Sequence, residues 1–158
     1  METYRRRSRG WQNDEPAYIH PRILFGAGIF LDVDFVKKHE ITHVVNCAFQ
    51  EDSPKWFRYA FPGRYVCIAA VDALDANILD WYDFFEKTVN KFLQDPTCKT
   101  IYVHCQCGIN RSGFLALLYA CKRLGYRYAD VVDSILTQRP CALTNPTFHQ
   151  QVKRYLNV

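Results

Sequence analysis

The run from His104 to Gly113, with the sequence HCQCGINRSG, constrains the fold of this chain more than any other feature. The four residues before it, 100–103, are β-branched or aromatic, which is typical of a buried strand. Apolar residues recur at helical spacing after it, and Gly125 stands where that helix would end. The run is therefore predicted to be a tight loop between a strand and the N-terminus of a helix.

Such a loop can hold an anion, because its N–H groups and the helix dipole point at one place. The same field favours the thiolate of Cys105, which is the nucleophilic form of cysteine. Arg111 adds a planar fork for two phosphate oxygens, and Ser112 can donate a hydrogen bond to the sulfur. We predict catalytic roles for Cys105, Arg111 and Ser112. The predicted phosphate-binding residues are Gln106, Cys107, Gly108, Ile109, Asn110 and Arg111.

Two other interpretations of this loop carry less weight. In the first, Cys105 is only a small buried apolar residue and Arg111 a helix cap, although strand, loop and helix all occur where phosphate chemistry needs them. In the second, His104, Cys105 and Cys107 bind a metal ion. Two thiols and a histidine on one tight loop lack a second pair of ligands, so we expect no metal site. The chemistry requires no organic cofactor.

Cleavage of a phosphate ester also needs an acid that protonates the leaving oxygen, and it should lie on a loop beside the phosphate. Asp72 and Asp75 are the candidates, both in the segment 71–77 between a predicted strand and a long predicted helix. We favour Asp72 because it follows the strand closely, whereas Asp75 is well placed to cap the helix. His104 is expected to orient the loop rather than to transfer protons.

Strand and helix patterns alternate along the chain. Strands joined by crossover helices indicate an α/β fold with a central, mostly parallel sheet flanked by helices on both faces. The segment 50–63, which contains two prolines, is predicted as a loop or short connection. The predicted strands are 23–25, 42–47, 65–69 and 100–103, and the predicted helices are 32–39, 78 to near Pro96, 114–124, 129–138 and 146–156.

Charge divides the chain into two parts. Four arginines between Arg5 and Arg9 against Glu2 give residues 1–9 a net charge of +3, out of +4 for the whole chain. We predict a basic, flexible arm over residues 1–19 that can contact a polyanion, and a catalytic domain over residues 20–158. The nearly neutral remainder argues against an enzyme that follows long nucleic acids.

The location of the protein is predicted from what the sequence does not contain. No apolar run approaches the roughly 20 residues of a membrane span, and the charged N-terminus is unlike a signal peptide. The seven cysteines are odd in number and scattered. We therefore expect free thiols in a reducing compartment, the cytoplasm or the nucleus.

The pattern H-C-x5-R-S at residues 104–112 resembles the signature of the cysteine-dependent protein tyrosine phosphatase superfamily. Residues 41–46, ITHVVN, resemble a strand of its small, atypical dual-specificity branch, which includes compact poxvirus members. Arg139 and residues 145–148 resemble the segment after the penultimate helix of that branch. The resemblance implies a phosphatase fold over residues 20–158, with a shallow pocket for phosphotyrosine, phosphoserine and phosphothreonine in proteins.

The same resemblance implies roles for individual residues. Cys105 would form a phosphocysteine, Asp72 would be the general acid, and Asn145 would brace the phosphate loop. Asn46 lies in the matching strand and is assigned a supporting role. Related phosphatases place a resolving cysteine near Cys47, which also ends a strand expected beside 100–104.

Alternatives remain open at this point. Asn110 before the arginine also occurs in a related RNA 5′-triphosphatase branch, and phosphoinositide phosphatases are a third possibility. A phospho-binding protein without activity is a fourth, against which the intact Cys105, Arg111 and Asp72 argue. The redox partner of Cys105 is also open, because Cys47 could be an ordinary buried thiol, and a bridge to Cys107 would be strained.

Overall fold

Five strands form one sheet in the order β1-β2-β5-β3-β4. The computed structural model describes residues 7–158. β1 pairs with β2 in antiparallel fashion, and the other pairs, β2–β5, β5–β3 and β3–β4, are parallel. The predicted mostly parallel sheet is therefore confirmed. The strands are β1 (Ala17–His20), β2 (Ile23–Ala27), β3 (Ile41–Asn46), β4 (Tyr65–Cys67) and β5 (Thr100–Cys105).

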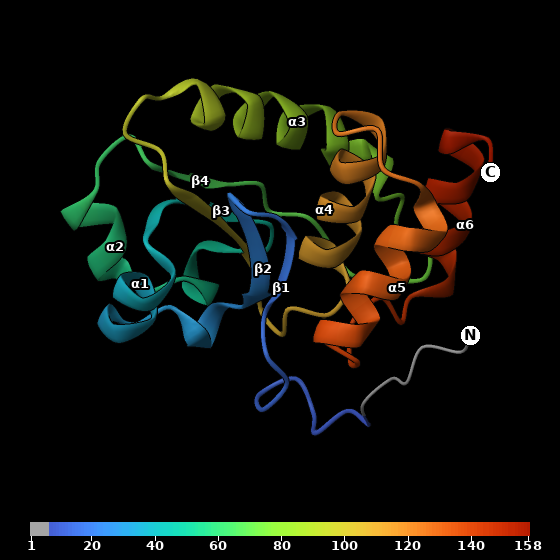
Figure 1. Cartoon of the computed structure of the whole chain (residues 1–158), viewed down its shortest axis with the longest axis horizontal. Coiled ribbons are helices and arrows are strands. Elements are labelled where there is room, and N and C mark those ends of the chain that lie inside the picture. The colour runs from blue at the N-terminus through green and yellow to red at the C-terminus, as the bar shows by residue number, and fades with distance from the viewer. Residues whose placement is uncertain (1–6) are drawn as a thin grey trace.

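Helices cover both faces of the sheet (Figure 1). Alternate residues of each strand point to opposite faces. Leu24 and Tyr102 pack with α1 and α2, whereas their neighbours Phe25 and Val103 pack with the larger core under α3 to α6. The helices are α1 (Val33–His39), α2 (Lys55–Ala60), α3 (Leu79–Gln94), α4 (Arg111–Lys122), α5 (Tyr128–Gln138) and α6 (Pro146–Leu156), with short 3-10 turns η1 (Gly28–Phe30) and η2 (Gln50–Asp52).

Several elements differ from the sequence prediction, and β1 was not predicted. α2 lies inside the segment predicted as a loop or short connection, because Phe57, which has no exposed surface, anchors a helix of 6 residues in the core. β4 ends at Cys67, two residues early. α4 begins at Arg111 rather than at residue 114, since its first turn faces the phosphate loop and so lacks the apolar pattern.

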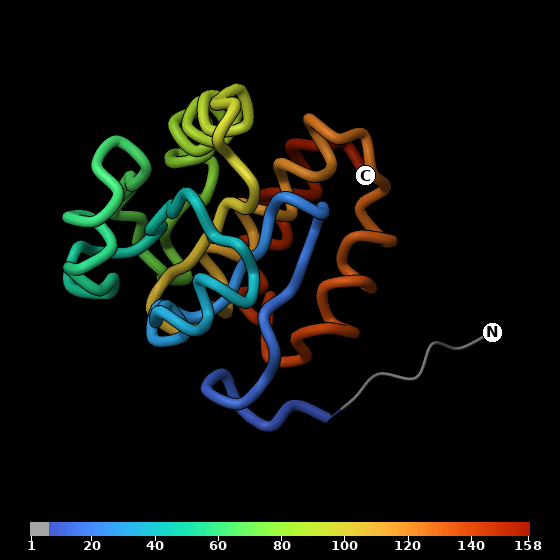
Figure 2. The backbone as a smooth tube through the Cα atoms, turned by 60° about the vertical axis from the view of Figure 1, so that its left-hand side comes forward, coloured from blue at the N-terminus to red at the C-terminus, as the bar shows by residue number. Residues whose placement is uncertain are grey.

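The predicted boundary between arm and domain at residues 19 and 20 is wrong. Residues 17–20 form β1, an edge strand of the sheet, and Gln138 at the end of α5 bonds the backbone N and O of Tyr18 at 2.8 and 2.9 Å. In Figure 2 the blue N-terminal segment passes close to the end of the orange α5. Residues 7–19 are thus part of the domain, and Arg5 and Arg6 lie outside the described residues.

Within residues 7–158, no helix is both long and apolar enough to cross a membrane.

Candidate active site

The loop of residues 106–111, called the phosphate loop below, joins the central strand β5 to α4. β5 ends at Cys105, and the parallel strands β2, β3 and β4 end at the same edge of the sheet, where α/β proteins bind ligands. Cys105 is 2% exposed, and its Sγ lies 3.2 Å from the Oγ of Ser112. The structure therefore brings the predicted nucleophile and its predicted hydrogen-bond partner together.

The backbone of the phosphate loop turns its carbonyl groups toward the surrounding protein. Four consecutive carbonyls accept hydrogen bonds from other segments. Since C=O and N–H of a trans peptide point in opposite directions, the N–H groups of residues 107–110 point away from those donors, toward the inside of the loop. This is an anion-binding arrangement. The bonds are Gly28 N to Gln106 O (3.3 Å), Arg139 Nη2 to Cys107 O (2.8 Å), Arg139 Nε to Gly108 O (2.7 Å) and Leu143 N to Ile109 O (2.8 Å).

Gly108 is required by the shape of this loop. Its φ is +65°, in the left-handed region that favours glycine. A Cβ at this position would collide with the backbone of Gly26 and Ala27 in β2. The loop therefore lies directly against β2, which no residue with a side chain would permit.

Arg111 connects the phosphate loop to the loop after β4. Its Nη1 donates to the carbonyl of Ala70 at 3.0 Å, and its Nε is buried without a hydrogen-bond partner among the described residues. A buried donor without a partner is costly, so this group is available for an anion. The preceding Ala69 has a φ of +58°, which places backbone strain next to the Arg111 contact.

Asp72 also lies against the phosphate loop. Its two carboxylate oxygens accept hydrogen bonds from Asn110 Nδ2 and Asn145 Nδ2, each at 3.1 Å. Asn110 is 8% exposed, and its Oδ1 accepts from the backbone N of Thr144 and of Asn145, both at 2.9 Å. Asn110 thus joins the phosphate loop, the acid loop (residues 71–77) and the turn before α6. This junction was not predicted from the sequence.

Asp75 occupies the other predicted position in the acid loop, and it is exposed. The expected helix cap at Asp75 is wrong, because Asn77 Oδ1 accepts from Leu79 N at 3.0 Å instead. Asn145 caps α6 as expected, with Oδ1 accepting from Thr147 N and Phe148 N. It therefore supports both α6 and Asp72.

His104 and Asn46 lie under the site and have no exposed surface. His104 Nδ1 lies 3.1 Å from the carbonyl of Cys105, and Nε2 lies 3.1 Å from Ser53 Oγ. Burial lowers the pKa of His104 to about 4, so a neutral ring holds the strand end. Asn46 organises the next loop, since its side chain bonds Phe49 O at 2.7 Å and Ala48 N at 2.9 Å.

The structure adds Arg139 to the site, although the sequence predicted no role for it in supporting the phosphate loop. It is fully buried, and it donates to Cys107 O and Gly108 O on one side and to Trp11 O and Asp14 O on the other. It therefore links the phosphate loop to the N-terminal segment. Its signal in the sequence was only its position in the segment after α5.

Cys47 directly follows β3, which ends one residue earlier than predicted, and lies beside the end of β5 at Cys105. Its N donates to His104 O at 2.6 Å, directly beyond the Asn46–His104 pair of β3 and β5. Burial, and then the neighbouring Cys105, raise the pKa of the Cys47 thiol well above its usual value. Burial likewise raises the pKa of Cys107. The seven cysteines are free thiols, and the described residues contain no cluster that could hold a metal ion.

Comparison with known proteins gives consistent results. A family profile described as "Dual specificity phosphatase, catalytic domain" matches residues 25–158. A probable dual specificity protein phosphatase of Dictyostelium discoideum is 27% identical over 137 residues, which are 87% of this chain and 33% of that protein. Dual specificity protein phosphatase 1B of Arabidopsis thaliana is 25% identical over 122 residues, 77% of this chain and 70% of that protein.

Solved structures share the fold. The human tyrosine phosphatase-like serine/threonine/tyrosine-interacting protein superposes with a TM-score of 0.76 and 23% identity, over 90% of this chain and 96% of that one. The chain spans only 33% and 13% of the lengths of the Dictyostelium protein and of Drosophila melanogaster protein phosphatase Slingshot.

Proposed function

Because the chain belongs to the dual specificity phosphatase family, we propose that it hydrolyses phosphotyrosine and phosphoserine/phosphothreonine in proteins through a phosphocysteine intermediate. One observation carries this proposal. Cys105 Sγ lies at the base of a loop whose N–H groups point inward, with Ser112 Oγ at 3.2 Å and the partnerless Nε of Arg111 beside it. This arrangement presents a nucleophile to a phosphate whose oxygens are already bound.

In the first step, the Cys105 thiolate attacks phosphorus on the side opposite the leaving oxygen. The S–P bond forms as the P–O bond breaks, and Asp72 transfers its proton to the departing oxygen. Arg111 and the loop amides stabilise the equatorial oxygens of the transition state, where the phosphoryl charge is spread.

In the second step, water hydrolyses the phosphocysteine. Asp72, now ionised, takes a proton from water while the new P–O bond forms and the S–P bond breaks. Ser112 donates to the sulfur and so stabilises the departing thiolate. Inorganic phosphate leaves, and Asp72 is again protonated for the next cycle.

The proposal is tested with Cys105→Ser and a small aryl phosphate. We expect no measurable turnover, because a serine hydroxyl is not ionised at neutral pH, while binding of an oxyanion such as vanadate is retained. Arg111→Lys should also be inactive, since a point charge cannot replace the bidentate fork. Appreciable hydrolysis by Cys105→Ser would exclude the phosphocysteine mechanism.

The second candidate function is RNA 5′-triphosphatase activity, which Asn110 before Arg111 favours. Phosphotyrosine and phosphothreonine peptides, 5′-triphosphorylated RNA and phosphoinositides should be compared in parallel at one ionic strength. We expect turnover of both peptides and poor release of the γ-phosphate from RNA. A large preference for RNA would replace the proposed function with the alternative.

The cellular location of the protein and the role of its basic arm are also proposals. We propose that the protein acts in the cytoplasm or the nucleus, supported by its free thiols. Contact of the arm with a polyanion is supported by the exposure of Arg7 and Arg9.

A further inference from the structure

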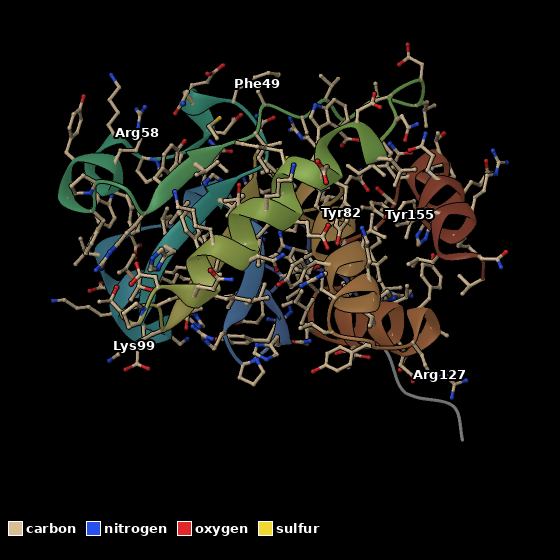
Figure 3. All side chains as sticks on the ribbon, turned by 90° about the horizontal axis from the view of Figure 1, so that it is seen from above. Phe49, Arg58, Tyr82, Lys99, Arg127 and Tyr155 are labelled. Atoms are coloured by element: carbon tan, nitrogen blue, oxygen red, sulfur yellow. The ribbon has the colours of Figure 1, made fainter. Side chains whose placement is uncertain are left out.

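Exposed apolar side chains gather on the loops around the phosphate loop. Ile29 follows β2, Phe49 follows β3, and Val71 and Leu74 follow β4, with exposures of 62, 42, 44 and 68%. Because these strands run parallel to β5, their loops leave the sheet at the edge where Cys105 lies. In Figure 3, Phe49 lies at the edge of the molecule opposite Lys99, which precedes β5. We call these four side chains the apolar rim.

The same loops contain carboxylates and no basic residue. This can be checked in segments 28–32, 47–54, 68–78, 106–110 and 140–145, none of which has a lysine or arginine. Arg111, at the end of the phosphate loop, is therefore the cation that the site itself supplies. The carboxylates in these segments are Asp32, Glu51, Asp52, Asp72 and Asp75.

Asp72 carries a proton when substrate binds in the proposed mechanism, so the negative charges are those of the other four residues, and they are not paired with cations. None of the ion pairs found within residues 7–158 includes any of the five carboxylates. Two arginines from other elements contact these segments. Arg139 is fully buried and its donors are used by backbone carbonyls, two of them in the phosphate loop. The second is Arg58 on α2, which is partly exposed. Its Nη1 donates to Gln50 Oε1 at 3.0 Å and its guanidinium lies over the Tyr65 ring at 5.6 Å, while its Nε has no hydrogen-bond partner among the described residues.

A substrate must place its phosphate next to Arg111 and its neighbouring residues over this surface. Apolar neighbours would cover the rim, and basic neighbours would meet carboxylates. A second phosphate or acidic neighbours would meet like charge over most of this surface, where Arg58 is the cation at its border, and this opposes association.

We propose that the apolar rim and the carboxylates around it select a singly phosphorylated protein segment whose neighbouring residues are apolar and basic. This inference rests on the proposed phosphatase function and narrows its substrates. It implies poor turnover of doubly phosphorylated segments and of molecules that carry several phosphates.

The test compares three phosphotyrosine peptides that differ only in the two residues next to the phosphotyrosine. These two residues are Leu and Lys in the first peptide (Leu/Lys), Leu and Glu in the second (Leu/Glu), and Ser and Lys in the third (Ser/Lys). At low salt we expect kcat/KM to be about tenfold higher for Leu/Lys than for Leu/Glu, and this ratio to shrink at about 1 M salt. We expect a preference of about fivefold for Leu/Lys over Ser/Lys, from burial of apolar surface.

Matched variants assign these preferences to the surface. Glu51→Lys should reduce or reverse the Lys-to-Glu preference, whereas Glu40→Lys, just before β3 at the opposite sheet edge, should leave it unchanged. Leu74→Ser should reduce the Leu-to-Ser preference, whereas Phe84→Ser, an exposed site on α3, should not. Ratios within one variant cancel general effects on folding or on the nucleophile.

The outcomes are distinguishable. Equal turnover of the three peptides, or a preference for Leu/Glu, with normal hydrolysis of an aryl phosphate would overturn this inference and leave the proposed function intact. Absence of hydrolysis of every peptide and of the aryl phosphate would overturn the proposed function itself, and with it this inference.

Discussion

At the scale of residues, the two aspartates of the acid loop differ in what they contact. Both are exposed, but Asp72 accepts hydrogen bonds from Asn110 and Asn145 beside the phosphate loop, whereas Asp75 has no hydrogen bond within residues 7–158 and does not cap α3. Hydrogen bonds fix the position of the carboxylate from which a proton must be delivered. The geometry therefore favours Asp72 as the acid.

Asp72→Asn should lower turnover of an alkyl phosphate by roughly 10²- to 10⁴-fold, the usual contribution of a general acid. It should have much less effect on an aryl phosphate with a good leaving group, which departs without protonation. Asp75→Asn is the matched control and should show neither effect. The assignment would be reversed if Asp75→Asn alone showed this dependence on the leaving group.

The buried His104 makes stability depend on pH. Its pKa in the folded protein is about 4, against an ordinary value of 6.5, so between these values the unfolded chain binds a proton that the folded protein does not. The neutral His104 ring therefore contributes its full share to the stability of the folded protein above pH 6.5, and this contribution is lost progressively as the pH falls to 4. The loss should reach about 2 kcal/mol at pH 5.

Urea unfolding at pH 7.5 and pH 5 measures this effect. His104→Gln should decrease the difference in unfolding free energy between the two pH values, even if it lowers stability at both. Burial also lowers the pKa of His43, so His43→Gln is a useful comparison. This variant should remove the separate contribution of His43 to the pH dependence of the unfolding free energy. An unchanged pH difference in His104→Gln would contradict the neutral, buried ring.

We predict that Cys47, whose backbone N bonds the carbonyl of His104 next to Cys105, reacts with oxidised Cys105. Peroxide converts a thiolate to a sulfenic acid, and a second thiol then forms a disulfide with loss of water. Non-reducing peptide mapping after brief peroxide treatment should find a Cys47–Cys105 linkage, and added thiol should restore activity. Cys47→Ser should instead lose activity irreversibly. Identical recovery of that variant and the unchanged protein would leave Cys47 as an ordinary buried thiol.

At the scale of elements, the sequence predicted those that carry a repeating apolar pattern. The periodic residues of α3 and the β-branched run of β5 give a strong signal because their burial is continuous. α2 and β1 were missed because each is short and is held by tertiary contacts, through Phe57 and through pairing with β2.

The candidate site could be predicted only in part, for the same reason. The relation of Cys105 to Ser112 follows from one loop and one helical turn, so local sequence suffices. The junction at Asn110 joins three loops that are 34 or more residues apart in the sequence, so no local sequence pattern predicts it. Arg139 is similar, because its partners come from both the phosphate loop and the N-terminal segment.

At the scale of the whole molecule, the N-terminal segment helps to hold the phosphate loop in place through its contacts with Arg139. Arg139 is fully buried and has only backbone carbonyls as hydrogen-bond acceptors, three of which belong to Trp11, Asp14 and Glu15. Asp14 is also held by Ser8 Oγ and Cys141 N, at 2.7 and 3.0 Å. The position of the loop therefore depends on residues far away in the sequence.

Two truncations separate this structural role from the charge of the arm. Deletion of residues 1–9 removes the arginines but keeps the carbonyls that Arg139 binds, so turnover of an aryl phosphate should change by less than about twofold. Deletion of residues 1–15 leaves buried guanidinium donors without partners, each costing about 1–3 kcal/mol. The longer deletion should lower the melting temperature and reduce kcat, because the carbonyls of Cys107 and Gly108 lose a fixed donor. Thermal unfolding and aryl phosphate kinetics on both truncations measure this, and equal behaviour of the two would show that Arg139 holds the loop without the N-terminal segment.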